Sequence, residues 1–456
     1  MKNKSIWSDT KLNKKYNSIN KNIDIDILII GGGFAGINVL FNLKDKDVIL
    51  VERNEICNGV TRNTTGKLTF LQDILFNIMK NDLNKAKIYL NSQIDAIKNI
   101  RSIINKNKID CNFEESKSYL FTKDDNNVYK IKLIKKFLEK NNIEVCENDM
   151  PLIKNLYSIS VKNTYLFNPI KYIDGLLNLI DDNKIYENTK ITYINYINNK
   201  YICKANDFII CANKIVLATH YPYFIYPYFF PLKCSLEKSY IVSYKDKIEN
   251  ISIISMDNPV ISMRNYLDNI LFLTNNRNIT TKVNDKDNFD DLLKRNNIDY
   301  IWSNVDIITN DYLPYIGFIN KNFLIVTGFN TWGMTNSVIS GLIIKDLING
   351  ENNKYINLFN PNRKLNSIRI ISDILNSVKG YYQGFINKNS SVKYAKLNGE
   401  SIMIYKGKVL KRKCPHAKCN LLYNEVEDTF DCPCHGSRFD SNGKCFNGPS
   451  NYDLTM

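Results

Sequence analysis

The chain has 456 residues, of which 44% are hydrophobic and 23% are charged. This composition excludes a disordered or collagen-like chain, and the length allows two or three domains. The net charge is +15, but no basic cluster carries interleaved aromatic residues, so we expect no nucleic-acid partner. No apolar run is long enough to form a transmembrane segment and the first residues lack the apolar core of an export signal, so we expect a cytoplasmic location.

The first predicted elements form a strand–helix–strand unit around a glycine-rich turn. An apolar strand leads directly into Gly31, Gly33 and Gly36, and a second apolar strand over residues 48–51 ends at Glu52. Glycines at this spacing permit a tight turn and a close approach of the backbone to a pyrophosphate, while the acidic residue accepts hydrogen bonds from a ribose. The unit predicts dinucleotide binding, with FAD and NAD both open. Because no second glycine motif of this kind and no C-x4-C redox pair follows, bound FAD is favoured.

The rest of the chain alternates short β-rich runs with helical patterns. The apolar spacing predicts helices that end near residues 43 and 347, helices over 84–105 and 361–379, and buried strands over 26–30, 214–219 and 323–328. Residues 230–305 are typical of an antiparallel sheet with one helix. A polar connector over residues 380–391 precedes a final region of short strands and turns.

Several of these segments resemble the D-amino-acid oxidase type of FAD-dependent oxidoreductases. The matching segments are residues 31–36 with Glu52, 59–69, 216–219, 311–317 and 327–334. The resemblance implies FAD as the cofactor, bound by Gly31, Gly33, Phe34, Ala35, Gly36, Glu52, Arg53, Thr64, Thr65, Lys67, Gly328, Trp332, Gly333 and Met334. It implies that Thr64, Thr65 and Lys67 lie near the flavin ring and the pyrophosphate, and that residues 328–334 form a loop over the ring. It also implies an amine or amino-acid-like substrate.

Three residues are candidates for a catalytic role in such a site. Arg264, on a predicted strand of the substrate domain, is a candidate to receive a substrate carboxylate through its planar fork, and a purely structural arginine is the competing interpretation. Lys67 fits either a position near the reactive flavin nitrogen or a phosphate contact, and we favour the phosphate contact. His220 ends a strand beside the expected cofactor, and a packed, hydrogen-bonded histidine is the competing interpretation.

Cysteine and histidine are concentrated near the carboxyl terminus, where two of the three histidines of the chain lie among cysteines. The motifs Cys414-Pro-His416 and Cys432-Pro-Cys-His435 each offer one thiolate and one imidazole. Such a set suits a 2Fe–2S cluster with both cysteines on one iron and both histidines on the other, and it also suits zinc. A zinc finger usually groups its cysteines together and its histidines together, so the observed alternation favours the iron–sulfur cluster.

Residues 432–440 resemble a cluster-binding loop of Rieske proteins, and Gly448-Pro449 resembles the proline loop that covers their cluster. The resemblance implies Cys414, His416, Cys432 and His435 as ligands, and a disulfide between Cys419 and Cys434 as in respiratory-type Rieske proteins. It also implies that Ser437 donates a hydrogen bond to a bridging sulfide, which raises the reduction potential. Lys418 stands where a glycine is usual and Phe439 replaces a tyrosine. These two departures bear on the potential rather than on the ligation.

These patterns and resemblances together predict a fold class and an order of domains. The fold class is an α/β FAD-binding, Rossmann-like domain with an interleaved α+β antiparallel-sheet substrate domain, followed by a small all-β Rieske domain. The predicted divisions are an N-terminal extension over 1–24, an FAD-dependent oxidoreductase region over 25–379, a linker over 380–391 and the Rieske domain over 392–456. Within the oxidoreductase region, the FAD-binding segments are about 25–110, 160–228 and 306–350, and the substrate domain is mainly 111–159 and 229–305.

The two halves together resemble bacterial fusions of an amine-oxidase-like FAD domain with a C-terminal Rieske domain, which implies an enzyme. We expect FAD to oxidise a small amine or amino-acid-like substrate, and electrons to leave one at a time through the Rieske cluster. The expected acceptor is a redox protein or a quinone-like compound. One alternative is a module that relays electrons between proteins without a small-molecule substrate. A second alternative is a zinc-stabilised binding protein.

Overall fold

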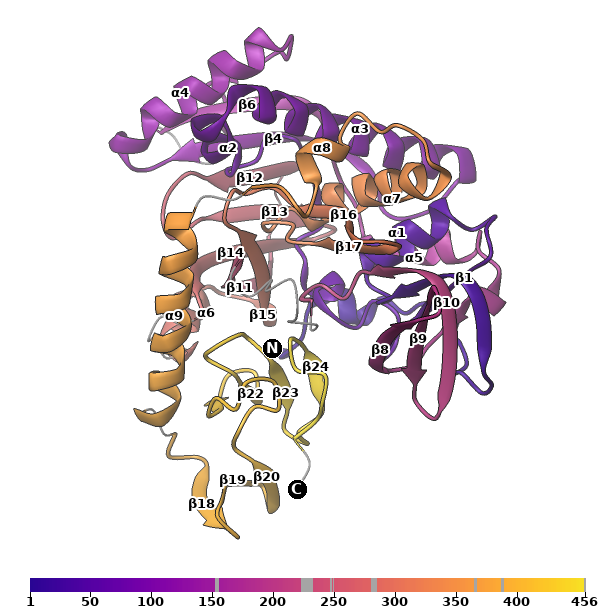
Figure 1. Ribbon diagram of the computed structural model, residues 1–456. Helices are drawn as coiled ribbons and strands as arrows, with labels where there is room; N and C mark the ends of the chain where they lie inside the picture. Colours follow the sequence, from indigo (N-terminus) through magenta and orange to yellow (C-terminus); the bar gives the residue numbers. More distant parts are fainter. Residues whose placement is uncertain are drawn as a thin grey trace.

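The computed structural model describes residues 1–151, 156–222, 233–246, 248, 250–279, 285–364, 367–386 and 389–454. Two large sheets with their helices form the main body, and a smaller all-β region lies below them in the view of Figure 1. Within the described ranges, no helix combines the length and the apolar character needed to cross a bilayer.

The first large sheet carries the predicted strand–helix–strand unit. Its strands are β1 (Ile23–Ile30), β2 (Val48–Val51), β7 (Ile185–Tyr186), β8 (Ile191–Ile197), β9 (Lys200–Ala205), β10 (Phe208–Leu217), β16 (Tyr315–Asn320) and β17 (Phe323–Thr327). Their order is β16-β17-β10-β1-β2-β7, with β9 and β8 attached beside β10. Strands β17, β10, β1, β2 and β7 run parallel to one another, whereas β16 is antiparallel to β17 and β9 is antiparallel to β10. Alternate apolar residues of β1 and β2 enter two different cores, as in a sheet that is covered on both faces.

Helices cover this sheet and join it to the second one. They are α1 (Phe34–Asn42), α3 (Leu83–Asn107), α5 (Pro169–Leu177) and α7 (Gly333–Asn349). Helix α1 packs on both α7 and α5, and α7 also packs on α3. The predicted helices near residues 34–43, over 84–105 and up to residue 347 are therefore confirmed, with ends that differ by a few residues.

The second large sheet is mainly antiparallel. Its strands are β3 (Lys67–Leu68), β4 (Glu114–Thr122), β5 (Cys146–Glu147), β6 (Tyr157–Leu166), β11 (Cys234–Lys245), β12 (Ile251–Ser255), β13 (Ser262–Tyr266), β14 (Asn269–Asn278) and β15 (Ile298–Thr309). The order is β15-β11-β14-β13-β12-β4-β6-β3, with β5 beside β6. Helices α2 (Leu75–Asn81), α4 (Asp125–Lys140) and α6 (Asp285–Leu293) accompany it. Strands β11 to β15 with α6 confirm the antiparallel sheet with one helix that the sequence predicts over residues 230–305.

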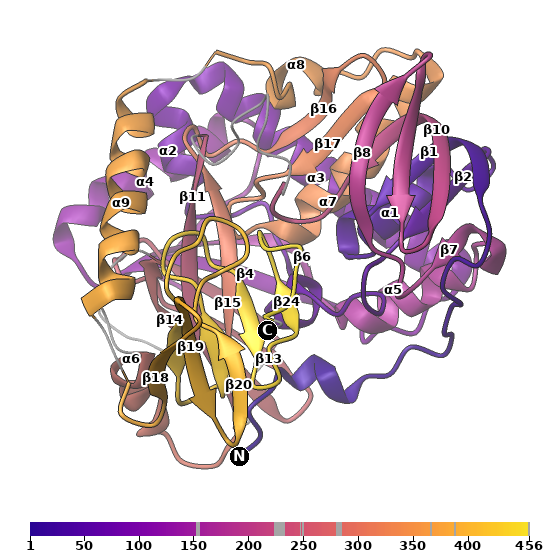
Figure 2. The same ribbon diagram turned by 60° about the horizontal axis from the view of Figure 1, so that its bottom comes forward.

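The carboxyl-terminal region is all-β, as expected, and has its own small core. It contains the hairpin strands β18 (Lys393–Leu397), β19 (Glu400–Tyr405) and β20 (Lys408–Lys411), and the strands β21 (Leu422–Asn424), β22 (Thr429–Asp431), β23 (Arg438–Asp440) and β24 (Cys445–Asn447). Met403, Leu421, Phe430 and Phe439 are fully buried inside it. Figures 1 and 2 both place this region next to β11 and β15.

The helix before this region begins and ends about six residues later than the range 361–379 that the sequence pattern predicts. After the short α8 (Ile356–Phe359), α9 (Ser367–Ile386) runs along the side of the molecule into the range expected to be a connector. Two glycines explain the difference. A Cβ atom at Gly380 would lie 2.4 Å from the carbonyl oxygen of Pro433, and one at Gly384 would lie 2.6 Å from that of Asn420. These glycines therefore allow close helix packing, whereas the sequence interpretation took them as signs of a loop.

The N-terminal segment packs against residues 62–64. The 3-10 helix η1 (Ile6–Asp9) buries Trp7 completely, and the indole Nε1 of Trp7 donates a hydrogen bond of 2.6 Å to the carbonyl of Thr64. Arg62 donates in return to the carbonyls of Trp7 and Thr10, at 3.1 and 3.0 Å. The remaining 3-10 helices are η2 (Val60–Asn63) and η3 (Asp182–Lys184). Residues 1–24 thus hold the loop after η2 in place.

Candidate functional site

The glycine-rich turn between β1 and α1 has the geometry that a nucleotide-binding loop needs. Gly31 has φ of +113°, and a Cβ atom there would lie 2.5 Å from the carbonyl oxygen of Ala218. A Cβ atom at Gly36 would lie 1.9 Å from the carbonyl oxygen of Gly31. Only glycine fits at these two positions, and the amino terminus of α1 begins directly behind the turn, where it favours an anion.

Glu52 at the end of β2 fixes the same turn from the other side. Its Oε2 accepts a hydrogen bond of 2.7 Å from the backbone N–H of Gly32, and its Oε1 accepts one of 2.8 Å from that of Asn54. Burial raises the pKa of this carboxyl above its ordinary value. Each carboxylate oxygen has a further lone pair, which leaves room for the ribose hydroxyls that the sequence predicts as its partners.

A large cavity begins at this turn and ends against the second sheet. Of the predicted FAD residues, those that line it are Gly31, Gly33, Phe34, Ala35, Glu52, Arg53, Thr64, Thr65, Lys67, Gly328, Trp332, Gly333 and Met334. Gly36 lies behind Gly31 rather than on the cavity wall. The structure therefore brings together residues from four distant segments of the chain around one space.

The loop at residues 328–334 closes one side of this cavity. Trp332 donates from its indole Nε1 to Asp73 Oδ1 at 2.9 Å, and burial raises the pKa of Asp73. Gly328 has φ of +73°, and a Cβ atom there would lie 2.5 Å from a side-chain carbon of Thr309. These contacts hold the loop in a fixed position on the cavity wall.

Lys67 lies on the cavity wall, but its ammonium group is directed at the second sheet. The Nζ atom donates to the carbonyl of Ile253 at 2.7 Å and to the hydroxyl of Ser262. Burial, with a smaller contribution from Arg264, lowers the pKa of Lys67 to about 7. This position differs from the phosphate contact that we favoured from the sequence, because both partners belong to the substrate-side strands β12 and β13.

Arg264 does not have the role of a substrate-carboxylate receptor in this structure. The side chain is almost completely buried and is absent from the described lining of the cavity. Its guanidinium donates to the carbonyls of Thr65 and Phe167, both at 3.1 Å, and also to that of Gly66. The structural interpretation of Arg264 is therefore the correct one, since its donors hold the backbone of the loop that carries Thr64 and Thr65.

His220 lies on the cavity wall at the end of β10, in a left-handed backbone conformation with φ of +63°. Its Nε2 is 3.0 Å from the carbonyl oxygen of Val305, so Nε2 carries the proton. Burial lowers the pKa of the ring to about 4, which keeps the imidazole neutral at pH 7. Thr327 donates to the carbonyl of His220. His220 is thus a packed, hydrogen-bonded histidine that also faces the cavity.

The sequence predictions miss several polar residues of the cavity wall, among them Glu237, Asn276, Asn304 and Asp306. Glu237 accepts a hydrogen bond of 2.9 Å from the Asn276 amide, and Asp306 accepts one of 3.0 Å from the Asn304 amide. Burial is the main cause that raises the pKa of Glu237, and burial together with Glu237 raises that of Asp306 to about 7. The signal available in the sequence was polar residues at alternate positions of two apolar strands.

The expected cluster ligands lie on two facing loops of the all-β region. Cys414 and His416 follow β20, while Cys432 and His435 join β22 to β23. The two imidazole rings are in an edge-to-face arrangement, with centroids 5.0 Å apart and an interplanar angle of 87°. Both ring nitrogens of His416 and Nδ1 of His435 are buried and have no hydrogen-bond partner among the described residues.

Unpartnered buried nitrogens beside two buried thiols fit a metal centre that draws on all four residues. The thiols of Cys414 and Cys432 are in hydrogen-bond contact, which lowers the pKa of Cys414 and raises that of Cys432, so the two sulfur atoms lie close enough to share one metal centre. Two sulfur and two nitrogen donors match the ligand set of a Rieske cluster. The described residues therefore have the donors that the cluster needs.

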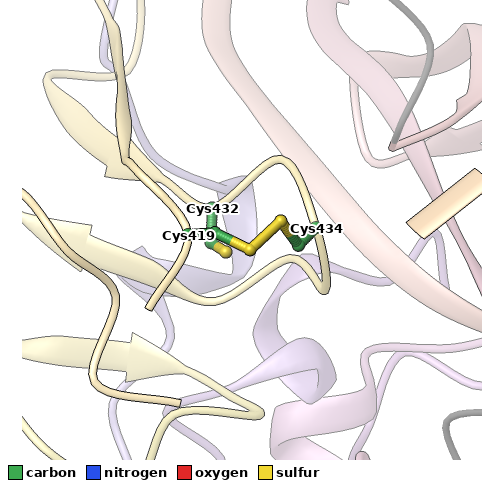
Figure 3. A group of neighbouring side chains, drawn as sticks. All are labelled: Cys419, Cys432 and Cys434. Atoms are coloured by element: carbon green, nitrogen blue, oxygen red, sulfur yellow. A yellow bond between two sulfur atoms is a disulfide. The ribbon is translucent and has the colours of Figure 1, made fainter. Parts of the chain in front are cut away.

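Cys419 and Cys434 form a disulfide that ties the two loops together, with Cα atoms 6.5 Å apart (Figure 3). Their sulfur atoms and that of Cys432 lie within 4.8 Å of one another. This group of three is no metal site, because two of its sulfurs are joined to each other. Cys432 remains free to serve as a ligand with Cys414.

The residues around the loops also account for one departure from the Rieske pattern. Lys418 has φ of +59°, a left-handed conformation that explains why a glycine is usual at this position. Ser437 interacts through its hydroxyl with the thiol of Cys414 and accepts a hydrogen bond of 2.8 Å from the backbone of Ser450. Phe439 is fully buried in the core of the region and offers no hydroxyl donor.

Family models agree with both parts of this geometry. The family described as FAD dependent oxidoreductase matches residues 26–347, and the Rieske [2Fe-2S] domain matches residues 385–455. The chain belongs to the FAD-dependent oxidoreductase family and has a C-terminal Rieske domain. It is an enzyme whose first part binds FAD and whose second part binds a 2Fe–2S cluster, and this sets aside the zinc-stabilised alternative.

One curated relative matches nearly the whole chain. The putative Rieske 2Fe-2S iron-sulfur protein YhfW of Bacillus subtilis (strain 168) is 27% identical over 488 residues, which cover 98% of this chain and 96% of that protein. Cytochrome b6-f complex iron-sulfur subunit 2 of Nostoc sp. (strain PCC 7120) is 44% identical over 43 residues, or 9% of this chain and 24% of that protein. The second likeness concerns the cluster region alone.

Solved structures of amino-acid oxidising enzymes share the fold of the first part. Glycine oxidase from Geobacillus kaustophilus has a TM-score of 0.61 at 15% identity, covering 75% of this chain and all of that one. L-proline dehydrogenase from P. horikoshii has a TM-score of 0.60 at 16% identity, covering 75% of this chain and 97% of that one. At this level of identity the likeness shows the fold and not the substrate.

Proposed function

We propose that this enzyme oxidises a small amine or amino-acid-like substrate at FAD and passes the electrons one at a time through the Rieske cluster to an external acceptor. When bound, FAD accepts a hydride from substrate, and the cluster accepts single electrons. A redox protein or a quinone-like compound is the acceptor in this proposal. The cytoplasmic location stays a prediction of the sequence.

The observation that carries the proposal is the position of the cluster loops against the wall of the cavity. A Cβ atom at Gly436, next to the ligand His435, would lie 2.8 Å from a side-chain carbon of Ile279, 3.2 Å from one of Leu236 and 3.4 Å from one of Val305. Leu236 and Val305 belong to β11 and β15, the strands whose next residues line the cavity. A single sheet therefore separates the cluster loop from the space for flavin and substrate.

The proline loop of the Rieske domain supports the same arrangement. Its residues 446–451 line the cavity directly. The guanidinium of Arg53, a predicted FAD residue, donates to the carbonyl of Ser450 at 3.0 Å, and the Asn451 amide donates to the carbonyl of Ile191 at 2.9 Å. These contacts join the loop over the cluster to the nucleotide side of the cavity.

A buried charge network fixes the docking of the two parts. Lys238 of β11 pairs with Asp431 at 2.8 Å and with Glu427 at 3.5 Å, and Arg438 pairs with the same two carboxylates at 3.1 and 2.7 Å. Glu427 also accepts hydrogen bonds from the backbone and hydroxyl of Ser303 on β15. The nearby cations Arg438 and Lys238 lower the pKa of both carboxyls, so both carboxylates are charged at pH 7. A buried network of this kind specifies one docked position.

The test is an anaerobic titration of the FAD- and cluster-loaded protein with a panel of amines and amino acids. We expect at least one of them to bleach the flavin absorbance and then to produce the rhombic electron paramagnetic resonance signal of a reduced Rieske cluster. If no compound reduces the flavin while reduced ferredoxin-like proteins exchange electrons with both centres, the protein-to-protein relay takes the place of this proposal.

A further inference from the structure

The two strands that separate the cavity from the cluster present a patch of polar groups to the cavity. In the antiparallel register of β11 and β15, Glu237 lies opposite Asp306, and Ser239 lies opposite Asn304. All four residues line the cavity. Two carboxylates directly opposite each other on neighbouring strands repel and destabilise a sheet unless a cation or a proton lies between them.

The hydrogen bonds of this patch leave acceptors facing the cavity. The Asn276 and Asn304 amides each donate to one oxygen of a carboxylate, as described above. The Oδ1 of Asn304 is buried and has no hydrogen-bond partner among the described residues, and the residue as a whole is only 7% exposed. An unpartnered buried acceptor is energetically costly. The patch is therefore short of donors, and a partner that brings N–H groups and positive charge supplies what it lacks, as a proton on Asp306 does below about pH 7.

Nearby basic side chains do not supply this charge. Among the described residues of the lining, Arg53 and Lys67 are the basic ones besides the neutral His220. Arg53 bonds the carbonyl of Ser450, and Lys67 bonds Ile253 and Ser262. Arg264, the candidate carboxylate receptor, is held by backbone carbonyls. The substrate side of the cavity thus has carboxylates where an amino-acid carboxylate would need a cation.

We propose that Glu237, Asp306 and Asn304 form a subsite for a second ammonium group of the substrate, so that the substrate class is a diamine or polyamine. This inference rests on the proposed amine oxidation. A hydride leaves a carbon whose neighbouring nitrogen has a free lone pair, so the nitrogen at the reacting carbon is neutral when it reacts. A cation held against the two carboxylates is consequently a different nitrogen of the same molecule.

The test measures binding of 1,4-diaminobutane to the FAD- and cluster-loaded protein by anaerobic isothermal titration calorimetry. The matched probes are 1-aminobutane, which lacks the second nitrogen, and 4-aminobutanoate, which has a carboxylate in its place. We expect the diamine to bind about 10- to 100-fold more tightly than either probe, the range of a charge-assisted hydrogen bond. Equal binding of the diamine and 4-aminobutanoate would overturn the subsite.

Variants separate the subsite from a general effect of charge. The double variant Glu237→Gln with Asp306→Asn is expected to weaken diamine binding about 10- to 100-fold while binding of 1-aminobutane stays the same. Glu400→Gln, which removes a carboxylate paired with Lys411 on an exposed hairpin, serves as the control and leaves the affinity unchanged. Unchanged diamine binding in the double variant, or Ca²⁺ binding at this pair in place of the diamine, would contradict the inference.

The outcome for the subsite is distinguishable from the outcome for the proposed function. If the diamine binds and depends on Glu237 and Asp306 but never reduces the flavin, the subsite stands and the proposed oxidation fails. If an amino acid reduces the flavin and the cluster while no binding of the diamine is measured, the proposed oxidation stands and the subsite fails.

Discussion

The cluster loops present all four expected ligands between Cys414 and His435, whereas the cavity wall is assembled from residues as far apart as Ile30 and Asn451. In the loops, a short stretch of chain and one disulfide are enough to bring the side chains together. In the cavity, the positions of the polar groups depend on which strands pair and in which register. Ligation is therefore a local property of this chain, while substrate selection is a property of its tertiary fold.

The largest effect is expected at the cluster. Cys432→Ser removes one of two sulfur ligands, and we expect the protein to lose essentially all of its cluster iron and acid-labile sulfide while the flavin spectrum remains. Cys146→Ser, at a partly exposed cysteine of β5, is the control and keeps the iron. Iron and sulfide analysis of both variants checks this, and a full complement of iron in Cys432→Ser would contradict the ligand assignment.

The next effect concerns the contact between the two regions. Lys238→Met removes one of the two cations of this network, so among the pairs described above Glu427 and Asp431 keep Arg438 as their cation. We therefore expect the free energy of unfolding to fall by less than about 3–5 kcal/mol, which is the cost of breaking a buried pair completely. Lys406→Met removes an exposed pair with Asp428 and is expected to change the free energy of unfolding much less than Lys238→Met does. Denaturant unfolding, followed separately at the flavin and at the cluster, measures both. Equal effects of the two variants would show that the buried network does not hold the docked position.

A smaller effect is expected in the glycine-rich turn. Gly36→Ala places a methyl group against the carbonyl of Gly31, and overpacking of this kind destabilises by about 1–3 kcal/mol and weakens FAD binding. Gly59→Ala is the matched control, since nothing lies within 4 Å of a Cβ atom there. The Rieske signal is expected to persist in both variants. FAD retained at full occupancy in Gly36→Ala would contradict the close approach.

The smallest effect is a dependence of stability on pH at the acidic pair. The pKa of Asp306 in the folded protein is about 7, above the ordinary value of 3.8. Between pH 3.8 and pH 7, the folded state therefore keeps a proton that the unfolded state has lost. This contribution to stability is complete below pH 3.8 and is lost as pH rises through 7. Asp306→Asn is therefore expected to stabilise the protein by about 1 kcal/mol above pH 7 and less at pH 5, as melting curves at both pH values would measure. A gain that is larger at pH 5 would contradict the raised pKa.

The same comparison explains how much could be predicted from the sequence. The turn at Gly31–Gly36 and the motifs around Cys414 and Cys432 depend on local spacing, and the sequence analysis found them. The pairing of Glu237 with Asp306 could not be found in this way, because it requires the register of two strands that are separated in the chain by three further strands and a helix. Arg264 shows the same limit, since a strand pattern does not reveal which carbonyls surround a buried guanidinium.

The central claim is that electrons pass from the flavin to the cluster within one molecule. Rapid photoreduction of the flavin in the loaded protein, with the cluster followed by its visible absorbance, tests this claim most directly. We expect the cluster to become reduced at a rate that does not change over a tenfold range of protein concentration. A rate proportional to protein concentration, or a cluster that stays oxidised beside a reduced flavin, would contradict it.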